Sequence, residues 1–495
     1  MKLSALLVAL VVGSTLPRAV SAAPPEDAIR NSVVQVFVTQ RAPNFAQPWT
    51  KAPAREGSGT GFVMDGKRIM TNAHVVRYGS QIYVQAYQSP DKVPAKVVAV
   101  APGIDLALLS VEEPGFFDNR PPIPMGEGLP KVKGTVNVYG YPLGGDQMSV
   151  TEGIISRVEA AAYVYRMPGL RVQIDAALNP GNSGGPAVSE GKLVGVAFSG
   201  VPSAENIGYL IPVEEISTFL ADIADGAYDG KPQLFDEFQT VENDALRARL
   251  GLPKGAGGAM VTRPAQPGDA YPLKEWDVIV RIGEHAIDSA AKVQVAADLQ
   301  LPFTYYVPKL ARDGKVQLTV LRGGKEMTVE APAPVEQPSK VPYLKDGYPS
   351  YFIYGPLVFT PLCKEMVAAY GQLMLRDRLL VMVEHLNDPP AFEGEQVVVV
   401  VSPMFSHRIT KSYGQPMPSV LSSVNGVSVR NLAHLAELLH DASGEFIEFK
   451  FAGRDTETMV FRREEIAAAT DEILTDNGIR KQFSDDVAQA WKGKK

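Results

Sequence analysis

Short apolar and β-branched runs follow one another through the first half of the chain, between about residues 33 and 212, and Gly and Pro separate them. Many short strands at roughly even spacing are typical of an all-β barrel or sandwich. A region of this size suits one double β-barrel domain, which an amphipathic helix over Glu214–Ile223 would close. The expected strands are Val33–Val38, Gly61–Met64, Ile82–Ala86, Lys96–Val100, Leu106–Val111, Val136–Tyr139, Gly153–Val158, Val172–Ile174 and Leu193–Phe198.

A second unit is predicted over residues 229–334. Val278–Ile282 has the pattern of a strand, and the runs Val316–Leu321 and Glu326–Val329 flank an Arg-Gly-Gly-Lys stretch. Two apolar runs separated in this way are a hairpin signal. The Pro-rich stretch 331–338 then predicts an extended, semi-rigid linker.

A third unit, over residues 335–463, repeats the same ingredients in the same order. The pattern predicts a strand at Val397–Val401, a tight turn at 424–427, a helix at Leu432–Leu439 and a strand at Phe446–Phe451. We therefore expect two related α+β domains after the β-rich one. The remaining residues, 464–495, predict a partly helical tail.

Residues 1–22 have the layout of a secretory signal peptide. Lys2 precedes the apolar run Leu3–Val12, and small residues near Ala22 suit a cleavage site. The run is too short to span a bilayer, which leaves a retained membrane anchor as the weaker alternative. The sequence thus predicts an exported protein, periplasmic or secreted, whose β-rich domain occupies residues 23–228.

Composition excludes several classes of protein. The net charge is −7, and no strong cluster of Lys and Arg is present, so nucleic acid is not an expected partner. The one cysteine, Cys363, has apolar neighbours, which predict a buried thiol rather than a nucleophile. The sequence has no His-Glu-x-x-His motif, cysteine pair or acidic EF-hand loop, so we expect neither a metal nor a cofactor.

The stretch from Asn179 to Pro186 places a serine, Ser183, among small residues. Serine is a weak nucleophile unless a base lies within hydrogen-bond reach and an orienting group lies behind that base. Backbone N–H groups that point at the developing oxyanion supply much of the rate in acyl transfer. Gly181 and Ser183 are the expected donors of this oxyanion hole.

A base and an orienting group precede this serine. His74 follows a predicted strand, and the other five histidines lie in the later units. Asp105 begins an apolar strand, where a buried carboxylate needs a hydrogen bond such as the imidazole provides. Asp175 is the alternative, although we expect it to bond the backbone of the serine loop. The order His, Asp, Ser is that of chymotrypsin-like proteases, so the residues predict a serine endopeptidase.

Two further stretches concern substrate access and the strand before the base. Ala177 lies six positions before Ser183, where trypsin-like pockets have an acidic floor, and Leu178 adds apolar surface. We therefore expect small or medium aliphatic side chains at the cleavage site. The glycine-rich stretch 57–61 lacks the Lys-Ser/Thr pair of a phosphate loop and is interpreted as a turn into a strand.

Several motifs together resemble the HtrA/Deg family of serine proteases, most closely its plant-type branch. In the protease domain they are GSGTGFVMDGKRIMTNAHVV, DLALLSVE, GYPLGGDQMSVTEGIISRVE, QIDAALNPGNSGGPAV and ENIGYLIPVEEI. Further along, YFIYGPLVFTPL, GEQVVVVVS and VNGVSVRNLAHLAELL resemble the second PDZ domain of that branch.

The resemblance implies a chymotrypsin-like double β-barrel followed by two α+β PDZ domains. It also implies trimer-based homo-oligomers and ATP-independent degradation of misfolded or damaged exported proteins. His74, Asp105 and Ser183 would form the catalytic triad, and Ser199 would border the specificity pocket. A loop over 160–170, with Arg166, would sense the PDZ domains.

The third unit contains a candidate cradle for a peptide C-terminus. Its backbone amides would hold the carboxylate. The cradle residues would be Gly355, Leu357, Val358 and Phe359. Alternatively, the PDZ clefts are blocked by the chain itself or serve assembly. Two other functions also remain open, namely a chaperone or scaffold for unfolded proteins and a narrow regulatory protease.

Overall fold

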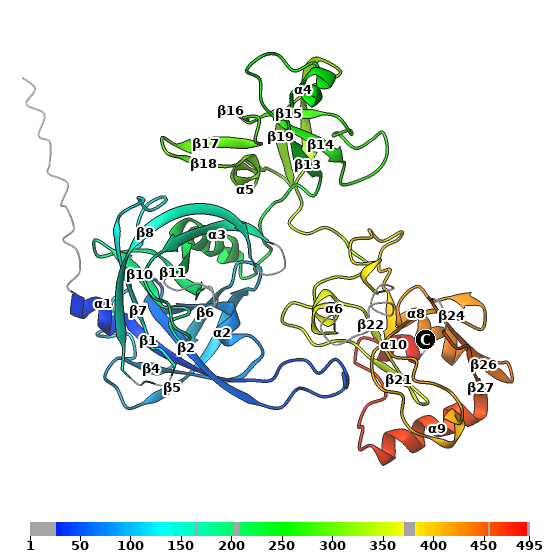
Figure 1. The fold of residues 1–495 in the computed structure, drawn as a ribbon. Helices are drawn as coiled ribbons and strands as arrows, with labels where there is room; N and C mark the ends of the chain where they lie inside the picture. The colour runs from blue at the N-terminus through cyan, green and yellow to red at the C-terminus, as the bar shows by residue number, and fades with distance from the viewer. Residues whose placement is uncertain are drawn as a thin grey trace, which may run out of the picture.

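The computed structural model describes residues 26–143, 145, 147–163, 167–200, 207–370, 382–453 and 456–492 (Figure 1). The predicted signal peptide lies outside these residues. Within them, no helix combines the length and the apolar character needed to cross a membrane.

The first barrel begins after a short helix and closes on itself. Its strands are hydrogen-bonded in the order β1-β2-β3-β6-β5-β4. The elements are α1 (Glu26–Ser32), β1 (Val33–Gln40), β2 (Arg55–Met64), β3 (Arg68–Thr71), α2 (Ala73–Val76), β4 (Gly79–Ala86), β5 (Lys92–Ala101) and β6 (Leu106–Val111).

A second closed barrel follows, in the order β10-β11-β12-β9-β8-β7. One hydrophobic core joins the two barrels, because Phe62 and Met70 of the first belong to the same buried cluster as Val196 and Ile211 of the second. The mainly β, chymotrypsin-like fold predicted from the sequence is confirmed. The elements are β7 (Thr135–Gly140), β8 (Ser149–Ala162), β9 (Pro168–Ile174), β10 (Pro186–Ser189), β11 (Lys192–Gly200), β12 (Gly208–Pro212), α3 (Val213–Asp222) and η2 (Ile223–Asp225).

The second unit is a twisted sheet with short helices. Its sheet runs β13-β14-β15-β19-β20, with β16 paired to β15 and a separate β17-β18 hairpin. The elements are β13 (Glu237–Thr240), α4 (Asp244–Leu250), β14 (Ala259–Arg263), β15 (Val278–Ile282), β16 (His285–Ala286), β17 (Lys292–Ala296), β18 (Leu299–Pro302), η3 (Phe303–Tyr306), α5 (Val307–Leu310), β19 (Lys315–Arg322) and β20 (Lys325–Pro332).

The third unit has the sheet β21-β22-β23-β24-β26-β27, with β25 paired to β24. The tail expected after residue 463 is part of this unit, since Ile466 and Val487 belong to its buried core. The elements are β21 (Phe352–Tyr354), β22 (Leu357–Pro361), α6 (Lys364–Tyr370), β23 (Val398–Val400), η4 (Arg408–Thr410), β24 (Ser419–Val424), β25 (Val427–Ser428), α8 (Leu432–His440), β26 (Phe446–Phe451), β27 (Met459–Arg462), α9 (Arg463–Asp476) and α10 (Ala488–Trp491).

The parallel between the second and third units is also a parallel of topology. In both, a strand pairs with a short hairpin strand and with a longer strand that follows a helix: β15 pairs β16 and β19, and β24 pairs β25 and β26. The last strands, β20 and β27, then pair with β19 and β26.

One interpretation of the sequence was wrong in the first barrel. The glycine-rich stretch 57–61 is not a turn but the middle of β2, fully paired with β1. A side chain at Gly59 would meet both Val75 and the carbonyl of Ser183. The lack of a side chain at Gly59 therefore lets the serine loop and the histidine turn pack directly against the backbone of β2.

Candidate active site

His74 and Asp105 contact each other through two hydrogen bonds. His74 lies on α2, a single turn at the edge of the first barrel, and Asp105 lies just before β6. The Asp105 carboxylate accepts the backbone N–H of His74 at 2.8 Å and lies 2.6 Å from its imidazole Nδ1. Asp105 is only 1% exposed, so these bonds satisfy a carboxylate that would otherwise be costly to bury.

The imidazole faces solvent on its other side, since the His74 side chain is 47% exposed. Burial lowers the pKa of His74, but the hydrogen bond and the charge of Asp105 raise it more, and the net shift is upward from 6.5. With Nδ1–H directed at Asp105, the neutral ring presents its Nε2 lone pair to the open side.

The Ser183 loop lies against the strands that precede His74. The Thr60 N–H donates to the Ser183 carbonyl at 2.9 Å, and a side chain at Gly184 would meet Thr71 and the backbone of Asn72. Among the described residues, the Ser183 hydroxyl donates to the Phe198 carbonyl at 3.3 Å and not to His74. Such hydrogen bonds are often long or absent in ligand-free active sites and form when substrate binds.

Two backbone amides of this loop are left open. The N–H groups of Gly181 and Ser183 take part in none of the hydrogen bonds between described residues. Gly181 has a φ of +100°, and a side chain there would meet the backbone of Tyr141 and Leu143, so only glycine fits. The Pro180 carbonyl accepts from the Leu143 N–H at 2.7 Å, which turns the trans-related Gly181 N–H to the opposite side.

Sequence reasoning missed Thr60, which ties the two barrels together beneath this loop. Its hydroxyl donates to the Gly181 carbonyl at 2.7 Å and accepts the Tyr141 N–H at 2.9 Å. The Thr71 hydroxyl in turn donates to the Thr60 carbonyl at 2.7 Å. Nothing in the sequence around Thr60 signals its contacts with Gly181 and Tyr141, because these partners lie in segments of the second barrel that are distant in the sequence.

A buried ion pair between α3 and the link to the second unit supports the second barrel. Lys231, in the link to the second unit, lies 2.8 Å from Glu215 of α3, and both side chains are less than 10% exposed. The other Glu215 oxygen accepts the Leu170 N–H at 2.8 Å. Leu170 also accepts the Tyr163 hydroxyl, and the Tyr163 ring packs on Phe198 with centroids 5.2 Å apart. Phe198 is the residue that accepts the Ser183 hydroxyl.

Two of the residues expected to border the specificity pocket, Leu178 and Ser199, lie against β12. Leu178 is half-buried and lies over Gly208, where a side chain would meet the Leu178 side chain. Ala177 is exposed, and Ser199 lies in β11, paired with Tyr209 of β12. Arg166 and most of the loop 199–205 lie outside the described residues.

The residues expected to cradle a peptide terminus are instead enclosed by the chain itself. Leu357, Val358 and Phe359 are at most 1% exposed. Gly355 has a φ of +55° and donates its N–H to the Thr470 hydroxyl of α9 at 2.7 Å, and Ile466 of the same helix occupies the space beside it. In this structure the turn is therefore covered by α9 and does not line an open groove.

Other candidates from the sequence lie apart from His74. Asp175 accepts the Ile154 N–H of β8, so it bonds a neighbouring strand rather than the serine loop. Cys363 is a buried thiol, as predicted, and burial raises its pKa to about 12. Within the described part of the chain, no group of three His, Cys, Asp or Glu side chains is arranged to hold a metal ion.

Residues 59–196 match the trypsin-like peptidase domain, and residues 341–486 match the PDZ domain, so that match includes α9. The chain is 35% identical over 470 residues to the Arabidopsis thaliana protein "Protease Do-like 2, chloroplastic", covering 93% of this chain and 76% of the relative. It is 36% identical over 412 residues to "Protease Do-like 4, mitochondrial" of the same plant, covering 83% and 76%.

Among solved structures, the chain is similar to an alanine variant of the HtrA-type protease AlgW with decapeptide. The TM-score is 0.50 at 23% identity, over 63% of this chain and 97% of AlgW, a likeness of fold alone. The matches to the two Do-like relatives extend well beyond the protease domain. They cover most of this chain and most of each relative. The resemblance inferred from the motifs is thereby confirmed: the chain belongs to the family of Do-like (Deg) proteases and is a serine endopeptidase.

Proposed function

We infer that the chain cleaves peptide bonds through His74, Asp105 and Ser183. The Ser183 hydroxyl attacks the substrate carbonyl carbon while His74 Nε2 takes its proton, and His74 then returns that proton to the leaving amine. Water then attacks the acyl group on Ser183, with His74 again as the base, and the acid is released. Asp105 fixes the tautomer and stabilises the imidazolium, and the amides of Gly181 and Ser183 stabilise the oxyanion.

The observation that carries this proposal is the His74–Asp105 pair, joined by two hydrogen bonds, next to a serine loop. Two backbone N–H groups of that loop have no hydrogen-bond partner among the described residues. The bonds at 2.6 and 2.8 Å orient the imidazole, and the serine loop packs on the residues just before His74. Ser183 reaches the imidazole by rotating its hydroxyl away from Phe198.

The proposed substrates are unfolded polypeptides, including misfolded or damaged exported proteins. An extended segment is needed to reach Ser183 between two barrels. Ala177 provides no acidic floor and Leu178 adds apolar surface over Gly208, which favours small or medium aliphatic residues at the cleaved bond. The second and third units (229–334 and 335–463, the latter completed by 464–495) would act as PDZ domains that tether substrate, regulate or assemble trimers.

The proposed export rests on the pattern of residues 1–22. The relatives above are named chloroplastic and mitochondrial, which suggests organelles as the alternative destination. N-terminal sequencing of the mature protein after cell fractionation distinguishes the two. A mature chain that begins near Ala23 and is found in an exported fraction supports the proposal. A chain that keeps residues 1–22 and stays inside the cell contradicts it.

The test of the chemistry is casein cleavage by the purified protein, with Ser183→Ala as its partner, across a range of temperatures. We expect the substitution to lower turnover by at least about 10³-fold. Cleavage that persists in the variant would refute Ser183 as the nucleophile. The same inactive variant, tested for suppression of aggregation, reports whether the protein is also a chaperone.

A further inference from the structure

The turn that carries His74 ends in contact with the third unit. Arg77 caps α2, and its backbone N–H donates to the Ala73 carbonyl at 2.8 Å. Its guanidinium lies 2.8 Å from the Asp346 carboxylate and 3.7 Å from that of Glu365, and it donates to the Lys345 carbonyl. In Figure 1, α2 lies on the side of the protease domain that faces the third unit.

The acidic residues of this contact are held in place by hydrogen bonds within the third unit. Glu365, on α6, accepts the backbone N–H groups of Leu344 and Lys345, each at 2.8 Å. The segment before β21 is thereby fixed to α6 in a shape that presents carboxylates to Arg77. The side chains of Arg77, Asp346 and Glu365 are 23%, 26% and 16% exposed, so water screens these charges less than at an open surface.

The residue after Arg77 has a disfavoured backbone that the third unit stabilises. Tyr78 has a φ of +55°, in the left-handed region that side chains with a Cβ rarely adopt. Its hydroxyl donates to the Lys345 carbonyl at 2.8 Å, and its ring packs on Tyr348 with centroids 5.8 Å apart. Such a conformation persists only where the surroundings determine it.

The His74 turn is also bonded to the last residue of β1, and the third unit holds the loop that follows this residue. Gln40, at the end of β1, donates from its side chain to the carbonyls of His74 and Val75, both at 3.1 Å. The loop over 41–54 begins at the next residue. The Tyr348 hydroxyl donates to the Arg41 carbonyl at 2.7 Å.

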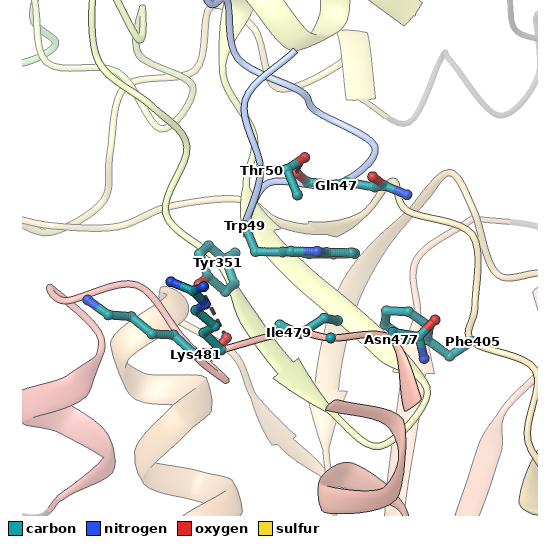
Figure 2. A pocket seen from close by; sticks show the side chains of 10 residues that line it. Gln47, Trp49, Thr50, Tyr351, Phe405, Asn477, Ile479 and Lys481 are labelled. Atoms are coloured by element: carbon teal, nitrogen blue, oxygen red, sulfur yellow. Dashed lines mark hydrogen bonds between the residues drawn. The ribbon is translucent and has the colours of Figure 1, made fainter. Parts of the chain in front are cut away.

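This loop inserts aromatic side chains into the third unit. Phe45 packs against the buried cluster that contains Cys363 and Met366. Figure 2 shows Trp49 between Tyr351 and Phe405. The Trp49 ring centroid lies 6.5 Å from that of Tyr351 and 5.6 Å from that of Phe405. A pocket of about 500 Å³ that is open to solvent lies beside these rings, between the loop and the third unit.

We propose that the docked third unit positions His74 for catalysis, with Arg77 as the positioning residue. The unit contacts the C-terminal end of the turn directly, through Arg77 and Tyr78. It also holds the loop 41–54, which follows directly on Gln40, the residue that bonds the His74 and Val75 carbonyls. Release of the unit frees the turn and lowers turnover. A displacement of about 1 Å at a catalytic group costs up to about 10²-fold in rate.

The test is Arg77→Glu in the full-length protein, assayed on a short fluorogenic peptide with an aliphatic residue at the cleaved bond. We expect kcat to fall about 10–100-fold with KM nearly unchanged, because the turn and not the substrate site is disturbed. Hydrogen exchange across 341–351 should rise as the unit is released. The charge-swapped double variant, Arg77→Glu with Asp346→Arg, should recover both measurements.

Arg68→Glu is the matched control, since Arg68 lies in the same barrel and bonds the Asp65 carbonyl at 3.0 Å. If Arg77→Glu fails to fold, the pair Asp346→Asn and Glu365→Gln removes the same charges from the other side and should lower kcat in the same way. A parental or raised kcat in either variant overturns the inference. The inference rests on the proposed function, which the Ser183-dependent activity of the parent tests separately.

Discussion

The second and third units share a topology and contact opposite halves of the protease domain. The second unit contacts α3, directly after the barrel that carries Ser183: Lys309 lies 2.7 Å from Glu214, and the Tyr305 hydroxyl donates to the same carboxylate at 3.2 Å. The third unit contacts the barrel that carries His74 and Asp105. Two units of one topology thus contact different parts of the protease domain through different side chains.

The two contacts also differ in kind. The contact at Glu214 consists of one ion pair and one tyrosine hydroxyl, and the side chains of Lys309 and Glu214 are 38% and 23% exposed. The third unit contacts the His74 turn through ion pairs and a tyrosine hydroxyl, and it also receives two aromatic rings from the loop 41–54. Coupling to the chemistry is therefore expected to be strong from the third unit and weak through this contact of the second.

Disrupting the His74 half itself should give the largest effect. Asp105→Asn removes the group that fixes the imidazole tautomer, and kcat should fall about 10⁴-fold. Asp105 raises the pKa of His74, and the reaction needs the neutral ring, so activity should fall as the pH drops through a value above 6.5. In the variant this acid limb should move to lower pH.

A pH–rate profile of kcat/KM on the peptide substrate checks both effects. The thermal midpoint of the variant serves as the control for folding. An acid limb that stays in place while the rate falls would contradict the assigned cause of the shift.

Disrupting the buried support of the Ser183 half should mainly cost stability. Lys231→Met leaves Glu215 buried without its partner, and the protease domain should lose about 3–5 kcal/mol. Replacing the pair together, with Lys231→Met and Glu215→Leu, should recover most of this loss, although the bond to Leu170 is lost. Chemical denaturation followed by hydrogen exchange of peptides from the second barrel measures it, and equal stability of all three proteins would refute the role of the pair.

The smallest effect is expected from the exposed contact of the second unit. Lys309→Ala breaks a pair worth about 0–1 kcal/mol, so kcat should change by less than about fivefold. Measured beside Arg77→Glu, it sharpens the contrast between the units. A larger loss for Lys309→Ala than for Arg77→Glu would reverse the comparison.

The sequence predicted the elements whose pattern is local. The strands Val278–Ile282 and Phe446–Phe451 were predicted with the bounds that the structure has. The strands β3, β10 and β12 were missed, since they are short and contain or adjoin polar residues and Gly or Pro. The glycine-rich part of β2 was misread as a turn because its glycines serve close packing between segments distant in the sequence.

The candidate site was predictable as far as motifs reach. His74, Asp105 and the serine loop have distinctive neighbours in the sequence. Thr60 and Arg77 do not, because they act through Tyr141 and Asp346, which lie more than 80 positions away. The peptide cradle at Gly355 looked open because the helix that covers it, α9, lies more than 100 residues later. Contacts of this range follow from the fold and not from local pattern.

Covalent labelling with a fluorophosphonate probe tests the central claim most directly, because the probe reacts only with a serine activated as a nucleophile. Mass spectrometry of the parent should find one adduct, on the peptide that contains Ser183, with labelling that fails in Ser183→Ala and slows strongly in Asp105→Asn. An adduct on a different serine, or labelling that survives Ser183→Ala, would contradict the account of this active site.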